Sequence, residues 1–210
     1  MPAKEEQRTN RQKIVDAAWE LLWRRGYHAS SVGDIARLAG VPKGSIYNYF
    51  DSKEELAAHC LSRIRYQTET HLRLEVLEGT LAPGDIIKRL LDHYEELFAR
   101  FDYGRGDPLA SRLNELADTH PDLVERLLPV QAVWHEVVTQ KLWAYATVAR
   151  IPELVEAADG LAALIYAALQ GVLLQMKVAH SPQPLRTARQ TLVAMVNAYV
   201  SALATGEVRS

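Results

Sequence analysis

The chain has 210 residues, of which 48 % are hydrophobic and 24 % are charged, so it is long and apolar enough to bury a sizeable core. Its net charge of -2 excludes a global basic field, and any binding to nucleic acid must therefore depend on a local cluster of basic residues. The single cysteine, Cys60, excludes an internal disulfide and a cysteine-based zinc site. Together with a charged N-terminus that lacks the apolar core of a secretion signal, it favours a cytoplasmic location.

Helical periodicity runs through the whole chain, and no alternating stretch or tight hairpin turn indicates a strand. We therefore expect an all-α fold. Thr9 and Gln12 can form a capping box, so the first helix is expected to begin at Thr9 and to end at Gly26, a residue that readily adopts the left-handed conformation found after helices.

Short elements follow the first helix. Ser31 opens a second helix that stops at Gly40, and Pro42 sits where proline is tolerated, at the entry of a third helix over residues 43–50. Ser52 caps a fourth helix. Two short helices joined by a glycine-containing turn and packed on a preceding helix are typical of a helix-turn-helix unit.

Longer helices fill the remainder of the chain. The fourth helix is expected to reach about residue 77. We expect five further helices: four at about residues 83–98, 107–117, 152–179 and 184–204, and one that begins at about residue 121 and carries Trp134 and Trp143. This change divides the chain into a small N-terminal domain, residues 1–55, and a larger helical domain, residues 56–210.

The third helix carries the chemistry of the N-terminal domain. In a helix-turn-helix unit the second helix of the pair enters the major groove. Residues 35–50 contain two basic side chains, Arg37 and Lys43, and no acid, which suits an approach to phosphate. The small residues Gly44 and Ser45 allow close approach. The predicted DNA-binding residues are Arg8, Arg11, Ser31, Arg37, Lys43, Gly44, Ser45, Tyr47, Asn48, Tyr49 and Lys53.

The segment over residues 9–56 closely resembles the N-terminal signature of the TetR family of bacterial transcriptional regulators. The matching positions read Ile35-Ala36, Ala39-Gly40-Val41, Lys43-Gly44, Tyr47, Tyr49-Phe50, Ser52-Lys53-Glu54 and Leu56. The resemblance implies a homodimer whose two small domains read the halves of a palindromic operator, and a helical body that binds a small-molecule effector. It departs from the family's usual pattern at Pro42, where a Ser or Thr cap is common.

A second resemblance covers part of the body. Residues 115–123, ELADTHPDL, and residues 168–185, ALQGVLLQMKVAHSPQPL, are similar to a TetR subgroup that includes sensors of reactive electrophiles and acrylate. Members of that subgroup often carry a cysteine where this chain has Asp107. Thiol-based sensing at that position is therefore excluded, and the effector class stays open.

Bulky and polar side chains of the body helices mark a candidate effector site, because ligand sites often lie between helices. Each aromatic side chain can equally be part of the core. The candidate residues are Tyr94, Phe98, Phe101, Arg112, Trp134, His135, Tyr166 and Gln170. No cofactor or metal is expected: His135-Glu136 lacks the second histidine of a zinc-hydrolase motif, since residue 139 is a threonine.

The uncharged stretch over residues 161–176 has two interpretations. It falls short of the ~20 residues that span a membrane, and Gln170, Gly171 and Gln175 interrupt it, so we expect a helix buried at a subunit contact instead. Two such helices from each subunit would form a four-helix bundle. The predicted dimer residues are Ala163, Ala167, Gly171, Val193, Val196, Tyr199 and Val200.

Three functions are compatible with this pattern. The first is a dimeric transcriptional repressor released by a small molecule. The second is an all-α enzyme with a fortuitous helix-turn-helix, although the chain shows no coherent nucleophile, metal or phosphate site. The third is a structural DNA-binding protein without an effector. The choice between repression and activation also stays open at this point.

Overall fold

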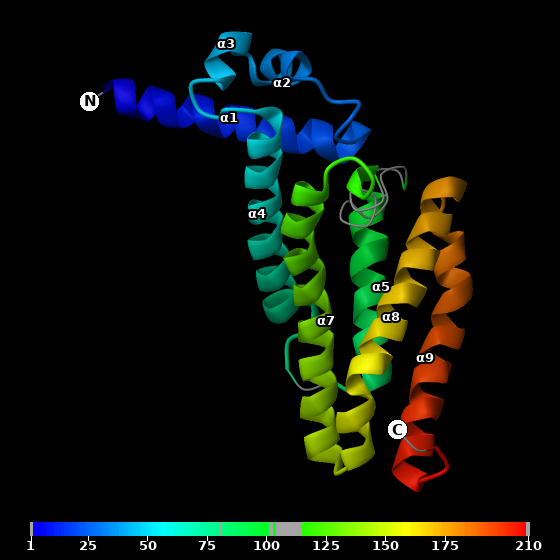
Figure 1. Ribbon diagram of the computed structural model, residues 1–210. Helices are drawn as coiled ribbons and strands as arrows, with labels where there is room; N and C mark the ends of the chain where they lie inside the picture. The colour runs from blue at the N-terminus through cyan, green and yellow to red at the C-terminus, as the bar shows by residue number, and fades with distance from the viewer. Residues whose placement is uncertain (1, 80, 101–102, 104–114, 209–210) are drawn as a thin grey trace. The chain divides into compact units, whose positions relative to one another are not determined.

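The computed structural model describes residues 2–79, 81–100, 103 and 115–208, and every regular element in these ranges is a helix (Figure 1). The all-α prediction is therefore confirmed. By internal contact the chain divides into two compact units: Met1–Tyr66 with Pro108–Val130, hereafter the head unit, and Gln67–Asp107 with Gln131–Ser210, hereafter the body unit. This division differs from the predicted one, because the described residues of the segment before α7 and of its first turns pack with the N-terminal part of the chain.

The head unit begins with a helix that is longer than expected. α1 covers Pro2–Arg25 and starts before Thr9. Residues 3–8 are Ala, Lys, Glu, Glu, Gln and Arg, which all favour helix, so propensity carries the helix through the potential cap at Thr9. At the other end Gly26 has a φ of 94°, as its role after a helix requires.

Three helices complete the helix-turn-helix region and its exit: α2 (Val32–Ala39), α3 (Lys43–Ile46) and the start of α4 (Lys53–His71). In Figure 1, α2 and α3 lie together on one side of α1. α3 is shorter than predicted: the N–H groups of Tyr49 and Phe50 both donate to the carbonyl of Ile46, so a tight turn closes the helix and brings Phe50 into the core.

The core of the head unit joins residues that are far apart in sequence. Ile14, Ile35, Ile46, Phe50 and Leu56 are almost fully buried in one apolar cluster. Leu116 and Leu123, from the segment before α7 (Pro121–Ala149) and from its first turn, belong to the same cluster. Their burial explains why the described residues 115–130 associate with the head unit rather than with the body.

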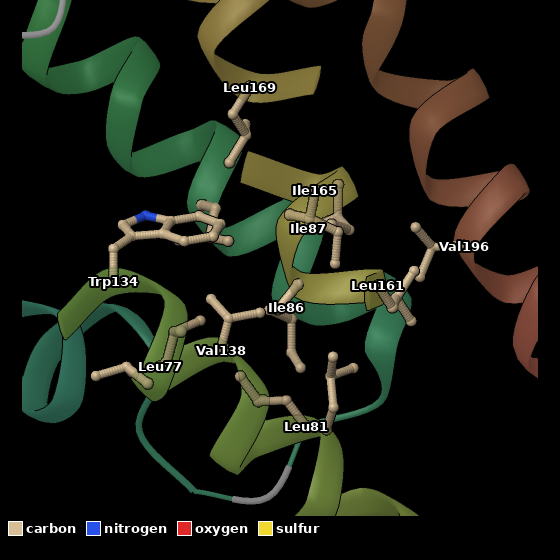
Figure 2. Packing of buried hydrophobic residues seen from close by; sticks show 14 of the residues in the cluster. Leu77, Leu81, Ile86, Ile87, Trp134, Val138, Leu161, Ile165, Leu169 and Val196 are labelled. Carbon is tan, nitrogen blue, oxygen red and sulfur yellow. The ribbon is translucent and has the colours of Figure 1, made fainter. Parts of the chain in front are cut away.

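The body unit contains the π-helix η1 (Leu72–Val76), α5 (Pro83–Ala99), the second part of α7, α8 (Pro152–Ala179) and α9 (Gln183–Thr205). These bounds confirm the predicted helices at 83–98, 152–179 and 184–204, and the predicted start of a helix at residue 121. The predicted helix at 107–117 falls mostly outside the described residues. α5, α8 and α9 pack against one another around an apolar core, part of which is drawn in Figure 2.

The contact between α5 and α9 is close and charged. A Cβ added at Gly84 would lie 2.5 Å from the side-chain oxygen of Asn197, so the Asn197 amide occupies the space that a side chain at position 84 would need. Nearby, Arg189 pairs with Asp92 and with Glu95. These contacts hold the last helix against the core of the body unit.

α8 carries the uncharged stretch. By length and composition alone it could cross a membrane, but the core helix of a globular protein has the same character, and 44 % of its most apolar window is buried inside the unit. Residues such as Leu161, Ile165, Leu169 and Leu173 pack into the core of the body unit, which accounts for much of this apolar character.

Candidate nucleic-acid interface and ligand site

Local hydrogen bonds position the helix-turn-helix. Ser31 caps α2 through its Oγ, which accepts from the N–H of Asp34 at 3.1 Å, while the Asp34 carboxylate accepts from the N–H of Ser31 at 3.3 Å. The hydrogen bonds from Ser31 lower the pKa of Asp34. Gly40 then ends α2 in the left-handed conformation, with a φ of 67°, and turns the chain toward α3. The predicted Ser31 start and Gly40 stop are confirmed.

α3 and the turn that follows it present a polar, acid-free surface. Lys43, Gly44, Tyr47 and Asn48 are exposed, and the Tyr47 side chain keeps 50 % of its surface. Ile46 and Phe50 point the opposite way and are buried. One side of this short segment is therefore anchored in the core. The other side carries the ammonium of Lys43, the amide of Asn48 and the phenol of Tyr47, which can donate hydrogen bonds to phosphate oxygens and to base edges.

The other predicted DNA-binding residues have more varied surroundings. Arg11 is exposed, and its guanidinium carbon lies 5.1 Å from the centre of the Phe50 ring. Arg37 is exposed and pairs with Asp34 at 3.1 Å. Ser45 and Tyr49 are half-buried. The side chain of Arg8 lies outside the described part of the structure.

Lys53 has a partner within the protein. Its Nζ donates to the backbone carbonyl of Tyr27 at 2.6 Å and lies 4.0 Å from the centre of the Tyr27 ring. Partial burial lowers the pKa of Lys53. The Tyr27 hydroxyl donates to the Glu54 carboxylate at 2.5 Å, and burial together with this bond raises the pKa of Tyr27. This arrangement ties the start of α4 to the turn after α1, and the role of Lys53 toward phosphate stays a prediction.

A polar contact that sequence reasoning missed joins the turn after α1 to the segment before α7. The N–H of His28 donates to Glu115 Oε1 at 2.8 Å, and His28 Nε2 lies 3.1 Å from Thr119 Oγ1. The rings of Tyr27 and His120 are 4.7 Å apart between centres. These partners are about 90 positions apart in the chain, so neither periodicity nor a local motif could have indicated them.

The predicted effector residues that the structure describes belong to the body unit. Phe98 and Trp134 are buried in its core, with Tyr94 and Tyr166 packed against them. The Trp134 and Tyr166 rings are 5.0 Å apart between centres. His135 Nε2 lies 2.6 Å from Asp159 Oδ1, a pairing that the sequence did not suggest. Gln170 is half-buried, and Phe101 and Arg112 lie outside the described residues.

The predicted dimer residues fall into two groups. Ala163, Ala167 and Gly171 are exposed on α8. On α9, however, Val196 and Val200 are buried in the core of the body unit, with Val193 and Tyr199 packed against it. This corrects the predicted interface, because Val196 and Val200 already bury their side chains within one protomer. Helical periodicity alone cannot show which of two apolar partners a residue faces.

Two known protein-family models match this chain, one in each part of the architecture. Residues 14–60 match the family model described as bacterial regulatory proteins, tetR family. Residues 83–191 match the model for the C-terminal domain of LmrA/YxaF-like transcriptional regulators. The first match covers the helix-turn-helix region, and the second runs from α5 into α9.

Curated relatives and solved structures agree with these matches. The transcriptional repressor DhaR of Mycobacterium sp. (strain GP1) is 27 % identical over 175 residues, which cover 83 % of this chain and 86 % of DhaR. The transcriptional regulator AcuR of Cereibacter sphaeroides is 27 % identical over 180 residues, covering 86 % of this chain and 82 % of AcuR. A crystal structure of the regulatory protein TetR from Rhodobacter sphaeroides superposes with a TM-score of 0.76 at 26 % identity, covering 88 % of this chain and 97 % of that one.

These relatives are transcriptional regulators, and the likeness to them extends over both the helix-turn-helix and the helical body. Since the C-terminal model alone spans residues 83–191, more than half of the 210 residues, and the N-terminal model adds residues 14–60, the chain belongs to the TetR family of bacterial transcriptional regulators.

Proposed function

We propose that the protein is a homodimeric repressor of the cytoplasm that binds a palindromic operator and is released from it by a small-molecule effector. The observation that carries the proposal is the surface of α3 and of the turn after it, where Lys43, Tyr47 and Asn48 are exposed. Ile46 and Phe50 anchor the same segment in the core. Because α3 is fixed from one side, its exposed side would be free to enter the major groove. No catalytic role is proposed.

An exposed apolar stripe supports the dimer. Leu164, Ala167, Gly171, Leu174 and Val178 are exposed on α8 and recur every three or four residues, so they share one side of the helix. Leucines that keep more than half of their surface in such a row indicate a protein contact. The small residues between them would let a second α8 approach closely, and Met195, exposed on α9, would extend the contact.

Dimerisation sets the spacing of the two α3 helices. A palindrome presents its half-sites about 34–36 Å apart, one turn of the duplex. α4 and α7 each supply residues to both the head unit and the body unit, so they are the continuous elements through which a bound effector would act. The buried leucines Leu116 and Leu123 would transmit the displacement of this segment to the helix-turn-helix.

The energy needed for release is modest. To change the population of dimers able to bind DNA from 99 % to 1 %, the effector must bind the form that cannot bind DNA about 10⁴-fold more tightly, a difference of ~5.5 kcal/mol. Two sites would share this as ~2.7 kcal/mol each, which is about the value of burying one aromatic or aliphatic group. A mainly apolar effector bound among the aromatic side chains of the body unit can therefore supply it.

The test is selection of bound duplexes from a random pool, followed by a screen for small molecules that release the selected duplex. A palindromic winner with a half-site spacing of one helical turn, and a compound that releases it, are the expected results. Equal affinity for every duplex would instead indicate a structural DNA-binding protein, and no retention of DNA would contradict the proposal altogether.

A further inference from the structure

The indole N–H of Trp134 is buried, and no described residue accepts a hydrogen bond from it. The side chain lies on α7 and keeps 3 % of its surface, and its Nε1 has no acceptor among the residues that the structure describes. Tryptophan N–H groups usually find a partner when they are buried, because an unpaired donor has lost its bonds to water without replacement. This donor therefore calls for an explanation other than packing.

The surroundings of the indole are apolar. The Tyr166 ring centre is 5.0 Å away, and Ile87 and Leu169 belong to the same buried apolar cluster, part of which Figure 2 shows. In the same view the nitrogen is on the edge of the ring turned away from Val138 and Leu77. Trp134 itself belongs to the apolar core cluster of the body unit. A ligand oxygen that reached this nitrogen would accept a hydrogen bond from one neutral donor, the Trp134 N–H, in an apolar environment.

We propose that the Trp134 N–H is the polar anchor of the effector site, and that the effector is a mainly apolar molecule carrying a neutral hydrogen-bond acceptor such as a ketone, ester or ether oxygen. This inference rests on the proposed effector function and names the chemical class of the ligand. An ionised carboxylate fits less well, since one neutral donor does not compensate a full negative charge removed from water.

The neutral acceptor also gives specificity. A site that holds a buried donor rejects an otherwise identical ligand without an acceptor, because the donor then stays unpaired. A second unpaired atom, the Thr139 hydroxyl, is five residues further along α7 and so about 140° around the helix from Trp134. It faces another side, and its hydroxyl can rotate toward a backbone carbonyl. Trp134 alone therefore supplies the unpaired donor of the proposed site.

Trp143 on the same helix provides a matched control. It is partly exposed, and its Nε1 already donates to the carbonyl of Val155 at 3.1 Å. Trp134→Phe keeps an aromatic ring but removes the N–H, and Trp143→Phe makes the same chemical change at a donor whose partner is known. The chain has four tryptophans, so loss of one indole N–H signal in each variant assigns both by nitrogen-15 NMR.

The experiment compares three probes of similar size: acetophenone, its carbon isostere isopropenylbenzene, and benzoate. Dissociation constants are measured by titration of the wild-type protein and the two variants, and the indole N–H signals are followed in the same titrations. The wild type and Trp143→Phe should bind acetophenone about ten-fold more tightly than isopropenylbenzene, the difference of one hydrogen bond. Benzoate should bind more weakly than acetophenone. Trp134→Phe should lose the ketone preference, and acetophenone should move the Trp134 signal but not that of Trp143.

Equal binding of acetophenone and isopropenylbenzene to the wild type would overturn the inference, and this comparison needs no variant to fold. Binding of neither ligand, tighter binding of benzoate, or a ketone preference that survives in Trp134→Phe would also overturn it. A different result would contradict the proposed function while leaving the ligand class intact. Acetophenone would bind with the predicted preference, but neither acetophenone nor any screened compound would release the selected duplex from the protein.

Discussion

Replacement of Leu123 by alanine tests whether the first turn of α7 is part of the head unit. Leu123 keeps 3 % of its surface within the cluster that also contains Ile14 and Ile35. Burying a leucine contributes ~1.5–3 kcal/mol, and the cavity left by alanine raises the cost of Leu→Ala in a core to ~2–5 kcal/mol. We expect Leu123→Ala to destabilise the head unit by about 2–4 kcal/mol.

Leu128 is the matched control. It lies on the same helix and in the same unit, but it keeps 49 % of its surface. Leu128→Ala makes the same chemical change at a position with little packing, so it should alter stability by no more than about 0.5 kcal/mol.

Native-state hydrogen exchange of the α1 amides between Ile14 and Leu22 is the suitable assay, because it reports on the head unit separately from the body. At about ten-fold for each 1.4 kcal/mol, protection should fall roughly 25- to 700-fold in Leu123→Ala and change little in Leu128→Ala. Equal losses of protection in the two variants would refute the assignment of this segment to the head unit, and with it the proposed route of release.

Four further outcomes are expected. Lys43→Ala should lower the slope of log affinity against log salt by about one unit on all operators, measured by fluorescence anisotropy; an unchanged slope would remove Lys43 from the phosphate contacts. Leu174→Glu places a charge on the exposed α8 stripe and should shift sedimentation toward monomer, and an undiminished dimer would show that the contact lies elsewhere. Gly40→Ala should lower the free energy of unfolding by roughly 1–2 kcal/mol in a urea titration, because an alanine is strained at a φ of 67°. No atom lies within 4 Å of the added Cβ, so backbone strain is the only cost expected. The hydrogen bond from Tyr27 lowers the pKa of Glu54 below its ordinary 4.5, so the stabilisation from this bond is present above pH 4.5 and is lost as the pH falls through the lower folded-state pKa. The difference in unfolding free energy between the wild type and Tyr27→Phe should therefore narrow over that range. A difference that stays constant with pH would contradict this linkage.

The local signals in the sequence were reliable where one turn of chain contains the whole interaction. The capping pair at Ser31 and the left-handed glycine at position 40 placed α2 correctly, because each depends on residues no more than four positions away. The start of α1 was predicted wrongly for a related reason: Thr9 can cap a helix, but the helix-forming residues before it extend the helix past that point.

Contacts between distant parts of the chain could not be predicted in this way. The Nζ of Lys53 contacts a carbonyl 26 positions away, and residues near 28 and 115–120 meet across about 90 positions. Periodicity shows that a side chain is apolar and on which side of its helix it lies, but it does not show what that side faces. For this reason Val196 could be assigned to a subunit contact although it packs within its own protomer.

The sequence by itself therefore determined the helical class of this protein, its helix-turn-helix and its family, because capping, turn geometry and the motif over residues 31–56 are encoded by neighbouring residues. Only the tertiary structure decided that the segment before α7 packs with the head unit and that the exposed stripe lies on α8. It also decided that the Trp134 donor is buried with no partner in the described part of the chain. These depend on which side chains from distant segments fill the same space, and close packing settles that for the chain as a whole.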